Sequence, residues 1–192
     1  MKKILLINIL ILFFSCKPKS DFKKIDFESF EITVPKNWNQ IELKGIDSYI
    51  GGIVTSENDT LIFDIGAYSP DASNELPLVF DKERYAELTE IQKILLKNTK
   101  HLIVDTISGD IDYKKYLKQK SEIVKIDCFN AKIITTINKG FGTTGIYIDS
   151  LKGGGQNSNK TKFSLYGENL KERTEKEFIK ALKTIKLTEY CR

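Results

Sequence analysis

The sequence predicts a single α+β domain in which an antiparallel β-sheet is flanked by helices. The chain has 192 residues, of which 41% are hydrophobic and 29% charged, and these values suit one globular core. Short segments of alternating apolar and polar residues, separated by turn residues, are typical of antiparallel strands. The clearest pattern near the end of the chain is helical. No linker in the sequence is long enough to divide it into two domains.

Alternating residues predict the strands in chain order. The first segment, 25–34, reads IDFESFEITV, with a turn or bulge at Glu28-Ser29 and Pro35 as its end. The other expected elements are strands at 47–56 and 60–69 joined by a turn at 57–59, a loop at 69–77, a strand at 101–107, a hairpin around 128–130, and strands at 145–151 and 162–167.

Apolar side chains at helical spacing predict two helices. The first begins after Asp81, a favourable N-cap, and the second begins with Thr174 and Glu177, which are spaced as a capping box. The second helix is expected to bury its apolar stripe against the sheet. The stripes are Tyr85, Leu88, Ile91 and Leu95 in the first helix, and Phe178, Ala181, Leu182 and Ile185 in the second.

The first sixteen residues have the pattern of an export signal. MKK is followed by ILLINILILFF and then by Ser15 and Cys16, which gives a basic start, an apolar run and a small residue before the cysteine. A membrane-spanning helix needs about 20 apolar residues, so an uncleaved anchor helix is disfavoured. Residues 1–15 are therefore predicted to be a cleaved signal peptide.

The end of this segment, Phe13-Phe14-Ser15-Cys16, resembles the lipobox of bacterial lipoproteins. In that family the leader is cut before the cysteine, the thiol receives a diacylglyceryl group, and the new amino terminus usually receives a further acyl chain such as palmitate. The resemblance implies that lipid on Cys16 holds the protein to a membrane without a spanning helix. Phe13 stands where leucine is commoner in the family. The alternative is that Cys16 is simply a small residue near a conventional cleavage site.

Residues 16–24 are predicted to be the lipidated cysteine and a polar tether, KPKSDFKK, that leads to a domain at 25–192. Some lipoproteins carry acidic residues just after the cysteine as a surface-export signal, whereas this tether is basic. The expected location is therefore the bacterial cell envelope, lipid-anchored and facing the periplasm.

The order of elements within the domain resembles the PsbP-like fold. The resemblance rests on the strand FEITVP at 30–35 followed by Trp38, on a meander, and on a late strand and terminal helix ending in TIKL at 184–187. It implies an α/β/α sandwich and an adaptor or assembly role, and it supplies no catalytic residues. We interpret Trp38 as a side chain that seals the core rather than as an exposed stacking platform.

The remaining two cysteines, Cys128 and Cys191, lie in the predicted domain. An exported location permits a disulfide between them, and two buried free thiols fit the sequence equally well. Together with His101 they would still lack a fourth metal ligand, and no CxxC spacing is present. We therefore expect no metal site and no cofactor.

Two glycine-rich segments are candidate ligand loops. Gly140–Gly145 spells GxGxxG, but a strand is expected after it where a nucleotide site needs a helix, so we expect a turn and no nucleotide. The polar loop that contains Gly153, Gly154, Gly155 and Asn157 is either a hairpin loop or a ligand loop that binds an anion.

His101, Asp110 and Asp112 are the residues from which a hydrolase could be built. His101 is the only histidine, and two carboxylates two residues apart can form an acid pair or part of a calcium site. A surface histidine and a solvated turn explain these residues as well, and no GxSxG element is present. We expect no enzymatic activity, with an envelope hydrolase that uses this cluster as the alternative.

The charge of the chain also limits the choice of partner. The formal net charge of +4 includes Lys2 and Lys3, so loss of the leader leaves +2, which is too small to predict a nucleic-acid partner. The sequence therefore predicts a lipid-anchored, non-enzymatic binding or accessory module. Its expected partner is a periplasmic protein, contacted through a face of the sheet or through the loop at 153–159.

Overall fold

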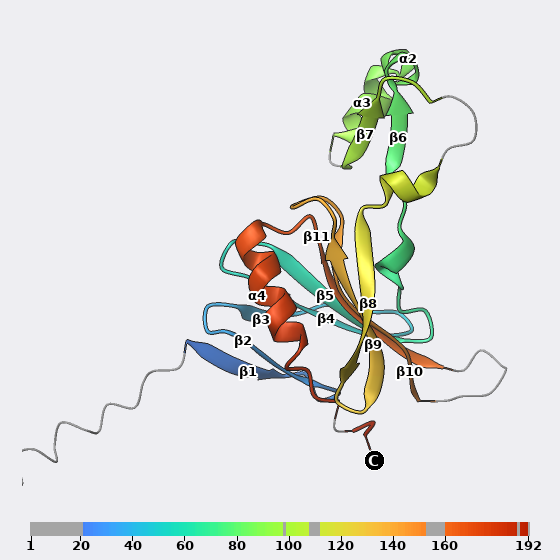
Figure 1. The fold of residues 1–192 in the computed structure, drawn as a ribbon. Helices are drawn as coiled ribbons and strands as arrows, with labels where there is room; N and C mark the ends of the chain where they lie inside the picture. Colours follow the sequence, from blue (N-terminus) through green and yellow to red (C-terminus); the bar gives the residue numbers. More distant parts are fainter. Residues whose placement is uncertain (1–20, 98, 108–111, 153–159, 188, 192) are drawn as a thin grey trace, which may run out of the picture.

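One large antiparallel sheet dominates the computed structural model, which describes residues 21–97, 99–107, 112–152, 160–187 and 189–191 (Figure 1). Within these residues the sheet has seven strands in the order β3-β4-β5-β11-β10-β9-β8, and all neighbours are antiparallel. The predicted α+β class with an antiparallel sheet is confirmed. The strands are β3 (Asn39–Glu42), β4 (Tyr49–Val54), β5 (Thr60–Gly66), β8 (Gln119–Ile126), β9 (Phe129–Thr136), β10 (Thr143–Lys152) and β11 (Thr161–Glu168).

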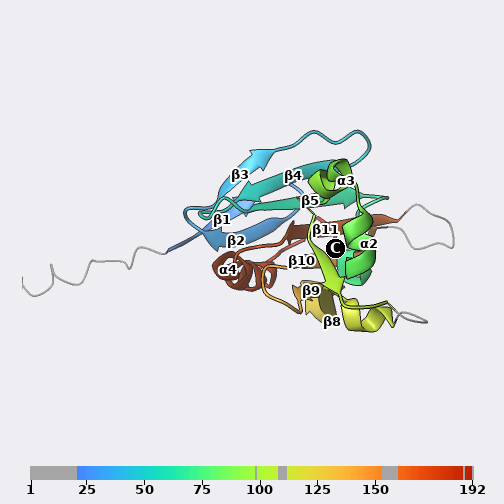
Figure 2. The same ribbon diagram turned by 90° about the horizontal axis from the view of Figure 1, so that it is seen from above.

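A hairpin and a helix cover one face of this sheet (Figures 1 and 2). β1 (Phe22–Asp26) pairs with β2 (Glu31–Pro35), and Glu28 takes a positive φ of 66° in the turn between them. α4 (Glu172–Leu182) contacts both β2 and β10. The predicted break at Glu28-Ser29 is therefore confirmed as a hairpin turn. The short edge strand β3 was not predicted.

Aromatic rings from the hairpin and the sheet form the centre of the core. Phe30 lies 5.1 Å from Phe63 and 5.0 Å from Phe163 between ring centres, and Phe27 lies 4.7 Å from Phe63, with the rings of each pair in an edge-on arrangement. Each such ring adds about 1.5–3 kcal/mol through burial, before any benefit of ring geometry. Trp38 is also buried, which confirms its interpretation as a core side chain.

The terminal helix begins earlier than its sequence suggested. Lys171 is the N-cap and makes no side-chain capping bond, whereas Thr174 is buried inside the helix and its hydroxyl donates to Glu57 Oε2 at 3.2 Å. The capping box predicted for Thr174 and Glu177 is wrong, because the turn between β4 and β5 takes the threonine hydroxyl. The predicted apolar stripe is confirmed, since all four of its members are buried: Phe178, Ala181, Leu182 and Ile185.

Glu172, in the first turn of α4, is expected to make stability depend on acidic pH. Its carboxylate lies 2.6 Å from Lys139 Nζ and 2.9 Å from Lys176 Nζ. Hydrogen bonds from Lys139 and then from Lys176 lower the pKa of Glu172 from its ordinary 4.5 to about 2. Because the folded pKa lies below the unfolded one, the stabilisation is complete above pH 4.5 and is lost as the pH falls towards 2.

Urea unfolding of the wild type and of Glu172→Gln across this pH range measures the effect. The variant is expected to have the lower free energy of unfolding at about pH 6, and the two proteins are expected to converge at about pH 2. A difference that stayed constant over the whole range would contradict the role assigned to the carboxylate.

Candidate functional site

An arm projects beyond one end of the large sheet (Figure 1). It comprises residues 78–104, which form β6 (Leu78–Asp81), α2 (Lys82–Glu87), α3 (Glu90–Leu96) and β7 (His101–Val104). β6 and β7 are parallel neighbours in a two-stranded sheet that is separate from the large one. Two strands alone are marginally stable at best in water, so contacts of other kinds matter for the arm.

Two capped helices replace the single helix that was predicted after Asp81. As expected, Asp81 caps the first by accepting a hydrogen bond from the Arg84 N–H at 2.7 Å. The backbone then becomes extended at Leu88, and Thr89 opens α3 with a capping box in which the Thr89 and Gln92 side chains each bond the other's backbone N–H. The prediction of one continuous stripe is wrong, because this second N-cap restarts the helix in a new direction.

No described residue of the arm is buried. Its internal packing is largely aromatic: the Tyr85 and His101 rings stack with their centres 5.3 Å apart, and Phe80 lies 6.0 Å from Tyr85 and 5.8 Å from His101. A folded segment usually offsets its loss of conformational entropy by burying apolar side chains. The described chain does not bury the apolar side chains of the arm. The apolar surface of the arm is therefore a candidate interface.

α3 carries the most exposed apolar side chains of the arm. Ile91, Ile94 and Leu95 are 72%, 65% and 71% exposed, and we call these three residues the α3 patch. Their i, i+3, i+4 spacing places them on one face of the helix. Leu78 and Ile103, on the paired strands, are also exposed.

Of the residues considered for a hydrolase, His101 and Asp112 lie in the described chain, and each makes contacts within its own element or with its neighbours in the arm. His101 lies in β7, where its ring contacts those of Phe80 and Tyr85, and its Nδ1 is 3.0 Å from the Thr99 carbonyl oxygen. Asp112 accepts a hydrogen bond from the Lys114 N–H at 3.2 Å at the start of a 3-10 helix. Asp110 lies outside the described residues, and the hydrolase stays a prediction.

The GxGxxG segment forms a turn between strands, as expected. Gly140 and Gly142 have positive φ angles of 68° and 115°, and β10 follows them directly where a nucleotide site would need a helix. The turn borders a polar cavity of about 80 Å³ at the base of the arm, with Lys100 and Lys118 in its lining. A cavity of this size is suited to a few water molecules.

The face of the large sheet opposite α4 carries a chain of alternating charges. Lys132 Nζ lies 2.5 Å from Asp71 and 5.5 Å from the centre of the Tyr147 ring. Tyr147 donates to Asp149 at 3.1 Å, and Asp149 also pairs with Lys160 at 2.7 Å. Burial, and then this bond to Asp149, raises the pKa of Tyr147 to about 12, so its hydroxyl remains a donor at neutral pH. The charged groups of this sheet face are thus already paired with one another and do not need a partner protein. The arm, whose apolar side chains are uncovered, is therefore the better candidate for a contact surface.

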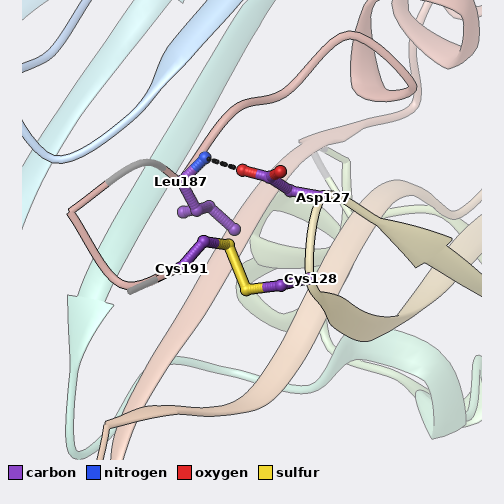
Figure 3. Close-up of a disulfide and its surroundings, with 4 residues drawn as sticks. All are labelled: Asp127, Cys128, Leu187 and Cys191. Carbon is purple, nitrogen blue, oxygen red and sulfur yellow. Dashed lines mark hydrogen bonds between the residues drawn. A yellow bond between two sulfur atoms is a disulfide. The ribbon is translucent and has the colours of Figure 1, made fainter.

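A disulfide joins Cys128 and Cys191, so the structure has the bridge rather than two free thiols (Figure 3). Cys128 lies in the turn between β8 and β9, and Cys191 lies after α4 with its Cα 5.8 Å from that of Cys128. Beside the bridge, Asp127 Oδ2 accepts a hydrogen bond from the Leu187 N–H at 2.9 Å. The two contacts together fasten the C-terminal segment to the edge of the large sheet.

Several predicted residues lie outside the described part of the chain. They include the signal peptide at 1–15, Cys16, and the loop residues Gly153, Gly154, Gly155 and Asn157. In the ranges that the structure describes, no helix has the length and apolar character needed to cross a membrane. The same ranges contain no group of three or more histidine, cysteine, aspartate or glutamate side chains placed to hold a metal ion.

Comparison of the chain with protein-family models and with curated proteins finds no match. Sequence patterns missed the arm as a surface because Ile91 and Leu95 were assigned to one continuous helical stripe. The spacing of Thr89 and Gln92, which fits a capping box, is the signal that would have revealed a second helix.

Proposed function

We propose that this protein is a lipid-anchored accessory module of the bacterial envelope that binds a protein partner through the arm. The observation that carries the proposal is the exposure of the α3 patch on an arm with no buried described residue. Apolar anchors at i, i+3 and i+4 are the pattern by which a helix docks into an apolar groove of another protein. The partner is accordingly a protein whose groove receives Ile91, Ile94 and Leu95.

The charges of the arm favour a protein over a bilayer as its occupant. Helices that lie on anionic membranes are rich in lysine and arginine on their polar face. The arm instead has nearly balanced charges, and within α3 Lys93 pairs with Glu90 at 3.3 Å. Its basic residues are Lys82, Arg84, Lys93, Lys97 and Lys100, and its acidic residues are Asp81, Glu83, Glu87 and Glu90.

The anchor is proposed on Cys16, because the lipobox-like Phe13–Cys16 follows a signal of the correct size. The basic tether after it favours a periplasm-facing position. The PsbP-like assignment is likewise a proposal, supported by β2 ending at Pro35 and by the buried Trp38 that follows it. An adaptor or assembly role is what this resemblance implies, and the α3 patch offers a surface for such a role.

Photo-crosslinking in intact membranes tests the proposed contact. A photoreactive amino acid at position 94 is expected to give a discrete adduct with one membrane or periplasmic protein. Position 123, on β8, is the matched control, because Ile123 is 66% exposed and Ile94 is 65% exposed. Equal adducts from both positions, or an adduct at twice the mass of the chain, would contradict a separate protein partner at the arm.

The intact mass of the membrane-purified protein tests the anchor independently. A mature chain that begins at Cys16 and carries the added mass of a diacylglyceryl group is expected. A product of unmodified mass in the soluble fraction would refute the anchor and leave the arm to be tested by crosslinking alone.

A further inference from the structure

A groove lies between the β1–β2 hairpin and α4, at the point where the described chain begins. It consists of two adjoining hollows of about 470 and 280 Å³, both of which are lined by Phe22, Pro35 and Glu177. Asp21, the first described residue, lines the larger hollow. The groove therefore opens where β1 begins, inside the segment predicted as the tether.

The smaller hollow has an apolar surface although threonines contribute to its lining. The Thr184 hydroxyl donates to the Ala181 carbonyl oxygen at 2.7 Å and accepts from the Thr33 N–H at 2.9 Å. Both hydrogen bonds join the hydroxyl to backbone groups of the protein, so the hydroxyl does not make the hollow polar. Phe22, which is 56% exposed, forms one wall. A hydrocarbon chain suits such a surface better than a polar ligand does.

Basic side chains line the same two hollows. Arg173 is paired with Glu177 at 3.2 Å, whereas Lys36 and Lys180 make no ion pair with any residue that the structure describes. Lys180 lines the apolar hollow, and Lys36 lines the larger hollow together with Asp21. An apolar hollow beside a more polar one that contains a lysine has the chemistry of a phospholipid site, with acyl carbons in the first and a phosphate near the lysines.

We propose that this groove binds an anionic phospholipid of the bilayer that holds the Cys16 anchor, an inference that rests on the proposed lipidation. Phe22 is six residues after Cys16, and an extended chain spans at most about 3.6 Å per residue, so the groove stays within about 22 Å of the anchored cysteine. Lys17 and Lys19, in the same short segment, add attraction to an anionic surface. Asp21 and Phe22 in its lining place the groove at the end of the described chain that is nearest in sequence to Cys16.

Tryptophan quenching by lipid tests the proposal on the full lipidated protein. The protein is reconstituted into vesicles of phosphatidylcholine and phosphatidylglycerol, with or without bromine on the acyl chains, and its fluorescence is compared in the two. Trp38 is buried, so the wild type is expected to show no quenching and provides the baseline. Phe22→Trp is expected to lose fluorescence in brominated vesicles, whereas Ile123→Trp and Ile94→Trp are expected to keep it.

The outcomes separate the groove from the anchor. One outcome is that the protein carries the diacylglyceryl mass and floats with the vesicles, while F22W is quenched no more than I123W. This outcome would contradict lipid binding in the groove and leave the proposed anchor intact. A protein without that mass overturns both. Stronger quenching at position 94 than at position 22 places the bilayer at the arm and also overturns the proposal.

Adding Lys36→Gln and Lys180→Gln to F22W is expected to reduce the quenching, and unchanged quenching would contradict recognition of the anionic headgroup.

Discussion

Replacement of Cys128 and Cys191 by serine is expected to lower the free energy of unfolding by about 4 kcal/mol. The bridge joins residues 63 positions apart, and in the chain-entropy treatment a loop of this length restricts the unfolded chain by about that amount. The bridge also fastens the segment after α4, where Leu187 is buried in the core. Urea unfolding of the double variant and the wild type gives the difference directly.

The wild type in a thiol reductant is the control for side effects of the serines. Reduction is expected to bring its unfolding midpoint to that of the double variant, and reoxidation is expected to restore it. A midpoint that reductant leaves unchanged, or a loss well below 2 kcal/mol, would contradict the stabilising role given to the bridge.

The spacing of a capping box corresponds to a real capping box at one position in the chain and not at another. Thr174 and Glu177 have the spacing of a capping box, yet α4 begins earlier because Glu57, from a distant turn, binds the Thr174 hydroxyl. Thr89 and Gln92 have the same kind of spacing and do form the box. The local sequence is alike in the two places. The difference comes from tertiary contacts, which a local pattern does not contain.

Strand pairs joined by short turns were predictable, since their alternation and turn residues lie close together in sequence. The turn at Glu28 and the hairpin around Cys128 are examples. The pairing of β6 with β7 was not predicted, because these parallel strands are joined through two intervening helices. The cysteine pattern likewise left bridged and free thiols as equal alternatives, because Cys128 and Cys191 are far apart in sequence and a local pattern does not show whether they meet. Only the meeting of the β8–β9 turn with the C-terminal segment decides between them.

The exposure of the α3 patch is the largest difference between the sequence-based prediction and the structure. Ile91 and Leu95 were placed on a continuous stripe with Tyr85 and Leu88, in a pattern that usually faces a core. The restart at Thr89 separates the two halves, and those residues are left on a helix at the end of the arm. A periodic apolar stripe shows that a helix has an apolar face. It does not show which molecule covers that face.

Replacement of Ile91, Ile94 and Leu95 together by serine is expected to weaken partner binding by at least about 4 kcal/mol, roughly a thousandfold. Each aliphatic anchor that enters an apolar groove contributes about 1.5–3 kcal/mol through burial, and serine removes most of it. The free energy of unfolding of the isolated protein is expected to change by no more than about 0.5 kcal/mol, because these side chains are exposed. Ile123→Ser, at an equally exposed position on β8, is the control and is expected to affect neither quantity.

Capture of the partner from solubilised membranes, with urea unfolding measured on the same preparation, tests the role of the arm most directly. The triple-serine variant is expected to lose capture and to keep wild-type stability. A loss of about 2–5 kcal/mol in unfolding free energy would mean that the α3 patch belongs to the core of the protein. Full capture at unchanged stability would mean that the partner binds elsewhere, and either result would contradict the proposed function of the arm.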